Sequence, residues 1–157
     1  VTFVPQNKLT MENLQSRARG LICMTYSNEF NWLVLACGNK SEAAMGYCTL
    51  YGDTCGAVMP LGDLYKTEVY ALAKLYPQIP RGIITRPASA ELSPDQKDSD
   101  SMPDYAVLDP ILRQIANGME TGDELFTNIK RRVRAAQFKR DQMAPVLKIK
   151  QDDKNNS

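Results

Sequence analysis

The residues best placed for chemistry lie in a short turn, residues 37–42, with the sequence Cys-Gly-Asn-Lys-Ser-Glu. The turn directly follows an apolar run at residues 32–36 and precedes a helical pattern. A buried strand, a glycine-containing turn and a helix, in that order, form the place where α/β proteins bind nucleotides. Spacing alone favours Glu42 as an ordinary acid at a helix start, where the dipole stabilises it, although a carboxylate is also a hard oxygen ligand suited to magnesium. The turn is therefore a candidate ligand site.

Lys66 stands at the beginning of a second predicted helix, which runs from Tyr65 to Leu75. A lysine ammonium is a compact charge that suits a phosphate group. A helix start disfavours a cation, so this placement supports a binding role over that of an ordinary solvated lysine.

Composition excludes several classes of site. The chain has no histidine, which rules out Ser-His-Asp and Cys-His nucleophilic pairs and His-based zinc sites. A net charge of +1 gives no reason to expect nucleic acid or an anionic membrane as a partner. The four cysteines show no Cys-x-x-Cys spacing, and we expect them to be reduced. We find neither a signal peptide nor a membrane-length apolar run, so we expect a soluble cytoplasmic protein.

The elements that must position these residues are predicted from hydrophobic spacing and capping signals. The pattern gives a buried parallel strand at 32–36 and a long loop at 86–104. It predicts one helix that begins after Thr10 and ends between Asn28 and Asn31, and further helices at 43–47, 65–75, 105–115 and 123–138. The last of these is expected to carry its basic residues on a solvated face: Lys130, Arg131, Arg132 and Arg134. An apolar stretch at residues 1–4 suggests a further strand. One clear strand is too few for a self-sufficient sheet, so we expect part of a domain, at residues 1–148, followed by a polar tail at 149–157.

Six short sequence motifs give the chain a more specific resemblance to a known family. They occur at residues 12–19, 38–42, 46–53, 60–67, 87–92 and 138–140. In this order they resemble the NAD synthetases, most closely the glutamine-dependent type. Each motif alone is a weak signal, but six motifs in the same order are specific. The resemblance covers about residues 5–146 and implies a partial adenine-nucleotide α-hydrolase-like domain of the ATP pyrophosphatase, Rossmann-like kind, mostly helices around one parallel strand.

The resemblance also implies a reaction. The carboxylate of nicotinic acid adenine dinucleotide (deamido-NAD) attacks the α-phosphate of ATP, and pyrophosphate leaves. Ammonia, free or derived from glutamine, then displaces AMP from the adenylated intermediate and gives NAD. ATP and magnesium are the implied cofactors, and a homodimer is the implied assembly. Magnesium and basic groups would hold charge while binding holds the geometry.

The resemblance also implies roles for individual residues, assigned one position at a time. The resemblance places three residues against ATP: Cys37, Lys66 and Ser89. It places five against deamido-NAD: Asn13, Arg17, Glu42, Asp53 and Lys139. Glu42 is also the implied magnesium ligand. Cys37 departs from the usual threonine, and a thiol is a weaker hydrogen-bond partner than a hydroxyl, so the contact with ATP is weaker or uses only the backbone. Each position also has an ordinary alternative, such as a surface arginine or a loop-capping aspartate.

Two features of the complete enzymes are missing from the sequence. The phosphate-binding loop Ser-Gly-Gly-x-Asp-Ser does not occur in these 157 residues, and no cysteine lies in a glutaminase context. We therefore expect the isolated chain to be inactive as a synthetase. Two hypotheses remain: part of an NAD synthetase, or a non-catalytic nucleotide-binding or dimerisation module derived from one. A generic α/β binding protein would explain the composition but not the six motifs in this order.

Overall fold

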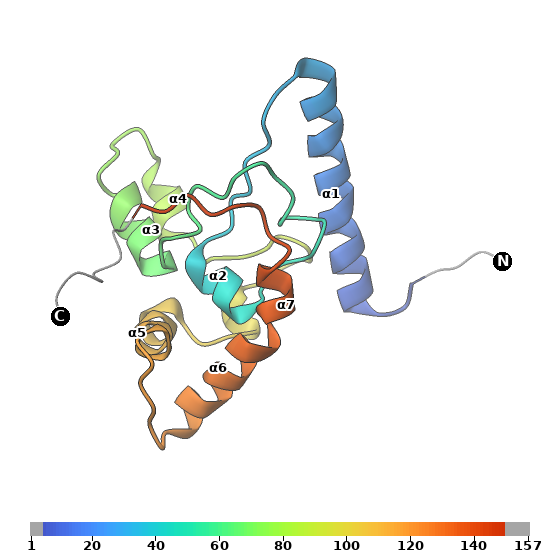
Figure 1. Cartoon of the computed structure of the whole chain (residues 1–157). Helices are drawn as coiled ribbons and strands as arrows, with labels where there is room; N and C mark the ends of the chain where they lie inside the picture. Colours follow the sequence, from blue (N-terminus) through green and yellow to red (C-terminus); the bar gives the residue numbers. More distant parts are fainter. Residues whose placement is uncertain (1–4, 150–157) are drawn as a thin grey trace.

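The computed structural model describes residues 5–149 as helices joined by long loops (Figure 1). Pairing between extended segments in this part of the chain is limited to two isolated parallel bridges, Leu35 with Val58 and Met59 with Val146. The helices are α1 (Lys8–Phe30), α2 (Lys40–Met45), α3 (Lys66–Ala73), α4 (Arg81–Thr85), the short 3-10 helix η1 (Asp98–Asp100), α5 (Tyr105–Ala116), α6 (Glu124–Ala135) and α7 (Gln137–Arg140).

The main core lies where α2, α3, α5 and α6 meet. Leu108 and Leu112 of α5 are buried against Met45 of α2 and Ile129 of α6, with Tyr65 just before α3. Burial of these apolar side chains is the principal force that holds the short helices together. Residues 105–115 were predicted as a helix despite Pro110, and α5 confirms it. This core fixes α2, and with it the turn at residues 37–42.

Helix α1 stands to one side of this core (Figure 1). It contacts the rest of the chain where Ser16 and Gly20 meet the loop around Gly52. A Cβ placed on Gly52 would lie 2.9 Å from the carbonyl carbon of Ser16, so only glycine allows this approach. The predicted start after Thr10 is wrong: the helix begins at Lys8, because the side chain of Asn7 accepts a hydrogen bond from the Leu9 N–H.

The predicted buried strand at residues 32–36 is corrected by the structure. Only Leu35 in this segment forms a bridge, and Trp32 and Leu33 are 61% and 77% exposed. Backbone hydrogen bonds join residues 34 and 36 to residues 57 and 58, on one side only. A parallel strand is buried when strands and helices cover it on both faces, and residues 5–149 supply no such cover here.

Other boundaries differ in smaller ways. The single helix predicted at 123–138 is two helices, α6 and α7, which meet at Ala136. Helix α4, between Pro80 and Arg86, was not predicted. The apolar stretch at residues 1–4 and nearly all of the polar tail lie outside the described residues.

The four cysteines are free thiols, as predicted. Within residues 5–149, no helix is both long and apolar enough to cross a membrane.

Candidate functional site

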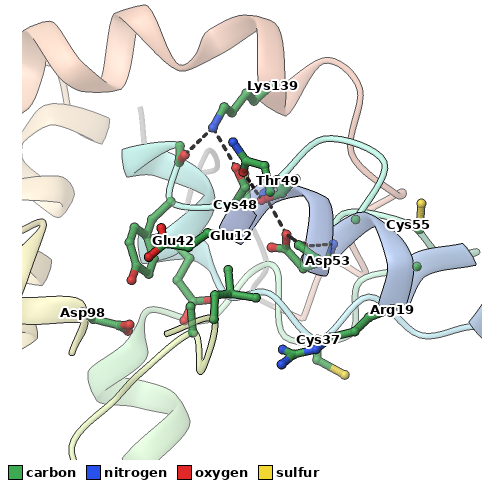
Figure 2. A pocket seen from close by; sticks show the side chains of 18 of the residues that line it. Glu12, Arg19, Cys37, Glu42, Cys48, Thr49, Asp53, Cys55, Asp98 and Lys139 are labelled. Carbon is green, nitrogen blue, oxygen red and sulfur yellow. Dashed lines mark hydrogen bonds between the residues drawn. The ribbon is translucent and has the colours of Figure 1, made fainter. Parts of the chain in front are cut away.

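One cavity of about 560 Å³ lies between α1, α2 and the long loop before α5 (Figure 2). Side chains from segments far apart in the sequence line it. Most of the predicted site residues are among them, namely Asn13, Cys37, Glu42, Asp53, Ser89 and Lys139. The cavity therefore brings together six of the eight residues selected from the sequence.

Glu42 is held at the entry of α2 by a reciprocal cap. The Asn39 side chain accepts a hydrogen bond from the Glu42 N–H at 3.0 Å, and the Asn39 N–H donates to Glu42 Oε2 at 3.1 Å. This capping box is the local reason why an Asn-Lys-Ser-Glu sequence starts a helix here. The other carboxylate oxygen, Oε1, lies 3.2 Å from Lys66 Nζ. Glu42 thus links the turn to the start of α3.

Burial raises the pKa of the Glu42 carboxyl above its ordinary value. The ammonium of Lys66 and the Asn39 N–H lower it in part, while the negative charge of Asp98 raises it further. Loss of hydration is therefore the dominant effect on this carboxyl. An ionised Glu42 is costly in the folded chain, and its site favours a cation that can compensate the charge.

We expect Glu42→Gln to change how stability depends on pH. A carboxyl whose pKa is raised by folding binds its proton more tightly in the folded state, so its contribution to stability falls as pH rises through and above its ordinary value of 4.5. The melting temperature of the variant should therefore rise relative to that of the parent chain between acidic and neutral pH. Thermal unfolding of both chains across this range measures it. A constant difference would contradict the assignment.

The predicted dinucleotide residues near α1 brace the loop that follows α2. Asp53 accepts hydrogen bonds from the Thr49 N–H at 2.7 Å and the Ser16 hydroxyl at 3.0 Å. Asn13 accepts one from the Thr49 hydroxyl at 2.7 Å. Arg17 donates to the backbone carbonyl of residue 50 and is not among the residues that line the cavity. Within residues 5–149, Asn13 therefore lines the cavity and Arg17 does not.

Lys139 closes the cavity from α7. Its ammonium donates to the carbonyl oxygens of Gly46 at 2.8 Å and Cys48 at 2.7 Å (Figure 2). Gly46 ends α2 with φ 63°, the left-handed conformation that suits glycine at this position. Lys139 thus fixes the carboxyl end of α2 and keeps its charge beside the cavity.

The three predicted ATP residues lie around the same region. Cys37 is an exposed thiol whose sulfur lies 3.6 Å from the Leu35 carbonyl oxygen. The Ser89 hydroxyl accepts a hydrogen bond from the Glu91 N–H. Lys66 is not among the lining residues, but its ion pair with Glu42 joins it to them.

The structure corrects one interpretation of the basic residues on α6. Arg131 and Arg134 are exposed, as predicted, but Arg132 lines the cavity and is not on a solvated face. Its guanidinium donates to the Met45 carbonyl at 3.0 Å and to the Ser101 carbonyl at 2.6 Å. The spacing along α6 indicated a polar face but not what that face meets.

Other lining residues were not selected from the sequence: Glu12, Arg19, Tyr47 and Asp98. Glu12 and Arg19 belong to the sequence motif at residues 12–19, which also contains the selected Asn13. Tyr47 likewise lies in the motif at residues 46–53. Asp98 falls in a loop rich in serine and aspartate, where no local pattern distinguishes it.

Asp109 positions the site without lining it. It is 1% exposed and accepts hydrogen bonds from the Ser41 hydroxyl at 2.5 Å, the Thr67 hydroxyl at 2.7 Å and the Thr67 N–H at 2.9 Å. The Ser41 hydroxyl in turn accepts from the Lys66 N–H at 2.9 Å. One carboxylate on α5 therefore sets the distance between the starts of α2 and α3, and hence between Glu42 and Lys66.

Comparison with known proteins extends these observations. A sequence model of the family described as NAD synthase matches residues 2–143. A glutamine-dependent NAD(+) synthetase from Xanthomonas campestris is 47% identical over 92% of this chain and 29% of its own length. One from Acinetobacter baylyi is 59% identical over 66% of this chain and 20% of its own length. The chain thus spans less than a third of these relatives.

Solved structures show the same likeness. An NMN synthetase from Francisella tularensis superposes with a TM-score of 0.75 at 26% identity, over 94% of this chain and 58% of that protein. An NH3-dependent NAD synthetase from Campylobacter jejuni gives 0.69 at 28% identity, over 93% of this chain and 58% of that one. A glutamine-dependent NAD+ synthetase from Acinetobacter baumannii, in complex with ADP, gives 0.51 at 40% identity, over 93% of this chain and 28% of that one. These likenesses confirm the predicted fold class, a partial adenine-nucleotide α-hydrolase-like domain.

Proposed function

Because the chain belongs to the NAD synthase family, we propose that it forms part of a catalytic domain that converts deamido-NAD to NAD. In this reaction ATP adenylates the nicotinate carboxylate, and ammonia then replaces AMP. The single observation that carries the proposal is the cavity, because it gathers six predicted site residues from separate segments around Glu42.

The roles we propose follow the geometry. Asp53 and Asn13 line the side of the cavity against α1, where with Lys139 they would contact the dinucleotide. Lys66, Ser89 and the backbone at Cys37 would contact ATP. Arg17 would contact the dinucleotide only after release from its backbone partner, or from a second copy of the chain. The exposed apolar side chains of α1, among them Leu21, Ile22 and Phe30, support a homodimer.

Magnesium would bind at Glu42. No three His, Cys, Asp or Glu side chains in the described part of the chain are grouped so as to hold a metal ion. Magnesium accepts a site of this kind, because it commonly takes one or two carboxylates together with phosphate oxygens and water. When bound, it would neutralise charge on the leaving pyrophosphate. The raised pKa of Glu42 fits a carboxylate whose charge a cation compensates.

The phosphate-binding loop and the glutaminase would come from other segments of the enzyme, in the same or another polypeptide. Glutamine is the proposed ammonia source, because relatives that are 47% and 59% identical are named glutamine-dependent. A cytoplasmic location stays a prediction. The alternative is a non-catalytic module that keeps the nucleotide pocket.

The proposal is tested by complementation. With ATP, magnesium, deamido-NAD and ammonium, the purified chain should form neither AMP nor NAD, because it lacks the loop that cradles pyrophosphate. Addition of a second polypeptide, the loop-bearing preceding segment of the Xanthomonas relative, should restore magnesium-dependent AMP and NAD formation, measured by chromatography. A folded mixture that binds ATP and stays inactive would support the non-catalytic module instead.

A further inference from the structure

The side chain of Arg140, on α7, holds the carboxyl-terminal half of α2. Its Nη1 donates to the carbonyl oxygens of Ala43 at 3.3 Å and Ala44 at 2.9 Å. Its Nη2 donates to the carbonyl oxygen of Val133, in α6, at 2.6 Å. The last carbonyls of a helix have no partner within the helix, and a guanidinium offers several donors in one rigid plane. Arg140 therefore fixes the end of α2 against α6.

Two further cations from the same stretch of chain bind the carbonyl oxygens that follow. Arg132 Nε donates to the carbonyl of Met45 at 3.0 Å. Lys139 Nζ donates to the carbonyls of Gly46 at 2.8 Å and Cys48 at 2.7 Å (Figure 2). Positive groups at this end also complement the helix dipole. Residues 132–140 thus supply cationic donors to the carbonyl oxygens of residues 43–46 and of residue 48.

The backbone of α2 also packs directly on the junction of α6 and α7. A Cβ placed on Gly46, the residue that ends α2, would lie 2.7 Å from the Cβ of Ala136. Ala136 is buried and lies between α6 and α7. Since no side chain fits in this gap, the end of α2 has little freedom to move relative to the two helices.

Glu42 lies near the other end of the same short helix. Helix α2 has six residues, fewer than two turns, and a helix of this length does not form on its own. Contacts with the rest of the chain therefore decide where it lies. The Glu42 carbonyl accepts a hydrogen bond from the Tyr47 N–H at 2.9 Å, and the first carbonyl bound by Arg140 belongs to the next residue, Ala43. The cations thus hold the backbone directly after Glu42.

We propose that Arg140 is a positioning residue that fixes the Glu42 carboxylate relative to the cavity through the backbone of α2. Within residues 5–149, Arg140 does not line the cavity, whereas Arg132 and Lys139 do. Arg140 therefore separates an effect on α2 from direct contact with a ligand. The ligand of Glu42 rests on the proposed function, whereas the positioning rests on the hydrogen bonds and the close packing of α2.

Amide hydrogen exchange on the whole chain, followed by NMR, tests the positioning. Arg140→Lys keeps the charge but loses the planar donors that reach both α2 and α6. At the amino end of α2, the reciprocal cap protects the N–H groups of Asn39 and Glu42. Their exchange should become at least about tenfold faster in the variant, because hydrogen bonds from a charged group are lost. The amides of α5 should change by a much smaller factor.

Two results would overturn the proposal. Faster exchange confined to residues 43–48 would show that the reciprocal cap holds Glu42 by itself. Equal acceleration in α5 would show that Arg140 only stabilises the chain as a whole. Arg134→Lys is the matched control, because Arg134 is an exposed residue of α6 and its replacement should leave all rates unchanged.

A milder variant covers the case in which Arg140→Lys does not fold. Gln137 is exposed, and its Oε1 accepts a hydrogen bond from Arg140 Nη2 at 2.7 Å. Gln137→Ala removes this acceptor and leaves the guanidinium in place. The exchange of the Asn39 and Glu42 amides should again rise more than that of α5, and the same two results would count against the proposal.

Kinetics of the complemented enzyme separate this inference from the proposed function. Arg140→Lys should raise the magnesium concentration for half-maximal AMP formation roughly tenfold, because residues that orient a ligating carboxylate set its affinity for the metal. In a Glu42→Gln enzyme it should have no further effect on this concentration. An active parent enzyme with unchanged magnesium dependence in Arg140→Lys would end the positioning role and leave the function standing. An inactive parent enzyme would count against the function, while the exchange rates would still decide the positioning.

Discussion

Asp109→Ala is expected to lower the free energy of unfolding of the chain by about 3–5 kcal/mol, which is close to the whole stability of many small domains. The carboxylate is 1% exposed, and its loss leaves the Ser41 hydroxyl and the Thr67 hydroxyl and N–H without their acceptor. Each buried polar group left unpaired costs about 1–3 kcal/mol. Urea denaturation followed by circular dichroism measures the change.

A matched control lies directly before the same helix. Asp104 precedes α5, is exposed, and makes no capping hydrogen bond to the described chain. Asp104→Ala should therefore change stability by less than about 0.5 kcal/mol. If Asp109→Ala behaved like Asp104→Ala, the proposed link between α2, α3 and α5 would be wrong.

Lys66→Ala is expected to reduce AMP formation by the complemented enzyme at least about a hundredfold, as when one charge-stabilising donor is removed from an active site. Lys66 Nζ lies 3.2 Å from Glu42 Oε1. It also lies 5.7 Å from the ring centre of Tyr70 and 5.5 Å from that of Tyr105. This setting leaves the ammonium little room to move, so it can hold a phosphate in a fixed position. Initial rates of magnesium-dependent AMP release measure the effect.

Lys74→Ala provides the comparison. Lys74 lies at the other end of α3, is exposed, and does not line the cavity. Its replacement should leave the rate within about twofold, since exposed charges away from a site contribute little. A comparable loss in both variants would point to an effect on α3 as a whole and not to a role of the Lys66 charge.

The Asp109 and Lys66 variants distinguish a residue that holds the site together from a residue proposed to contact its ligand. Asp109 has several donors, and its loss should cost stability. Glu42 is a half-buried carboxyl with a raised pKa, and Asp98 is a buried carboxyl that lines the same cavity. Carboxyl groups whose pKa is shifted by burial are concentrated at functional sites, where a ligand can compensate their charge.

The sequence alone determined the family and the local structure of the site. The Gly-Asn-Lys-Ser-Glu turn contains its own capping box, so Asn39 and Glu42 place the carboxylate through contacts three residues apart. Glycine at residue 46 likewise specifies the end of α2. Such features are readable because their partners are neighbours in the chain.

The tertiary structure alone decided which distant residues share the cavity. Arg132 faces it and Arg17 does not, although both are arginines on polar helix faces. The strand predicted at 32–36 depended on cover that residues 5–149 do not supply, so Trp32, Leu33 and Leu35 are exposed although Ala36 is buried. Asp98 comes to line the same cavity as Glu42 only in the folded chain. Local spacing cannot specify these outcomes, because burial and charge neighbours are set by segments tens of residues apart in the chain.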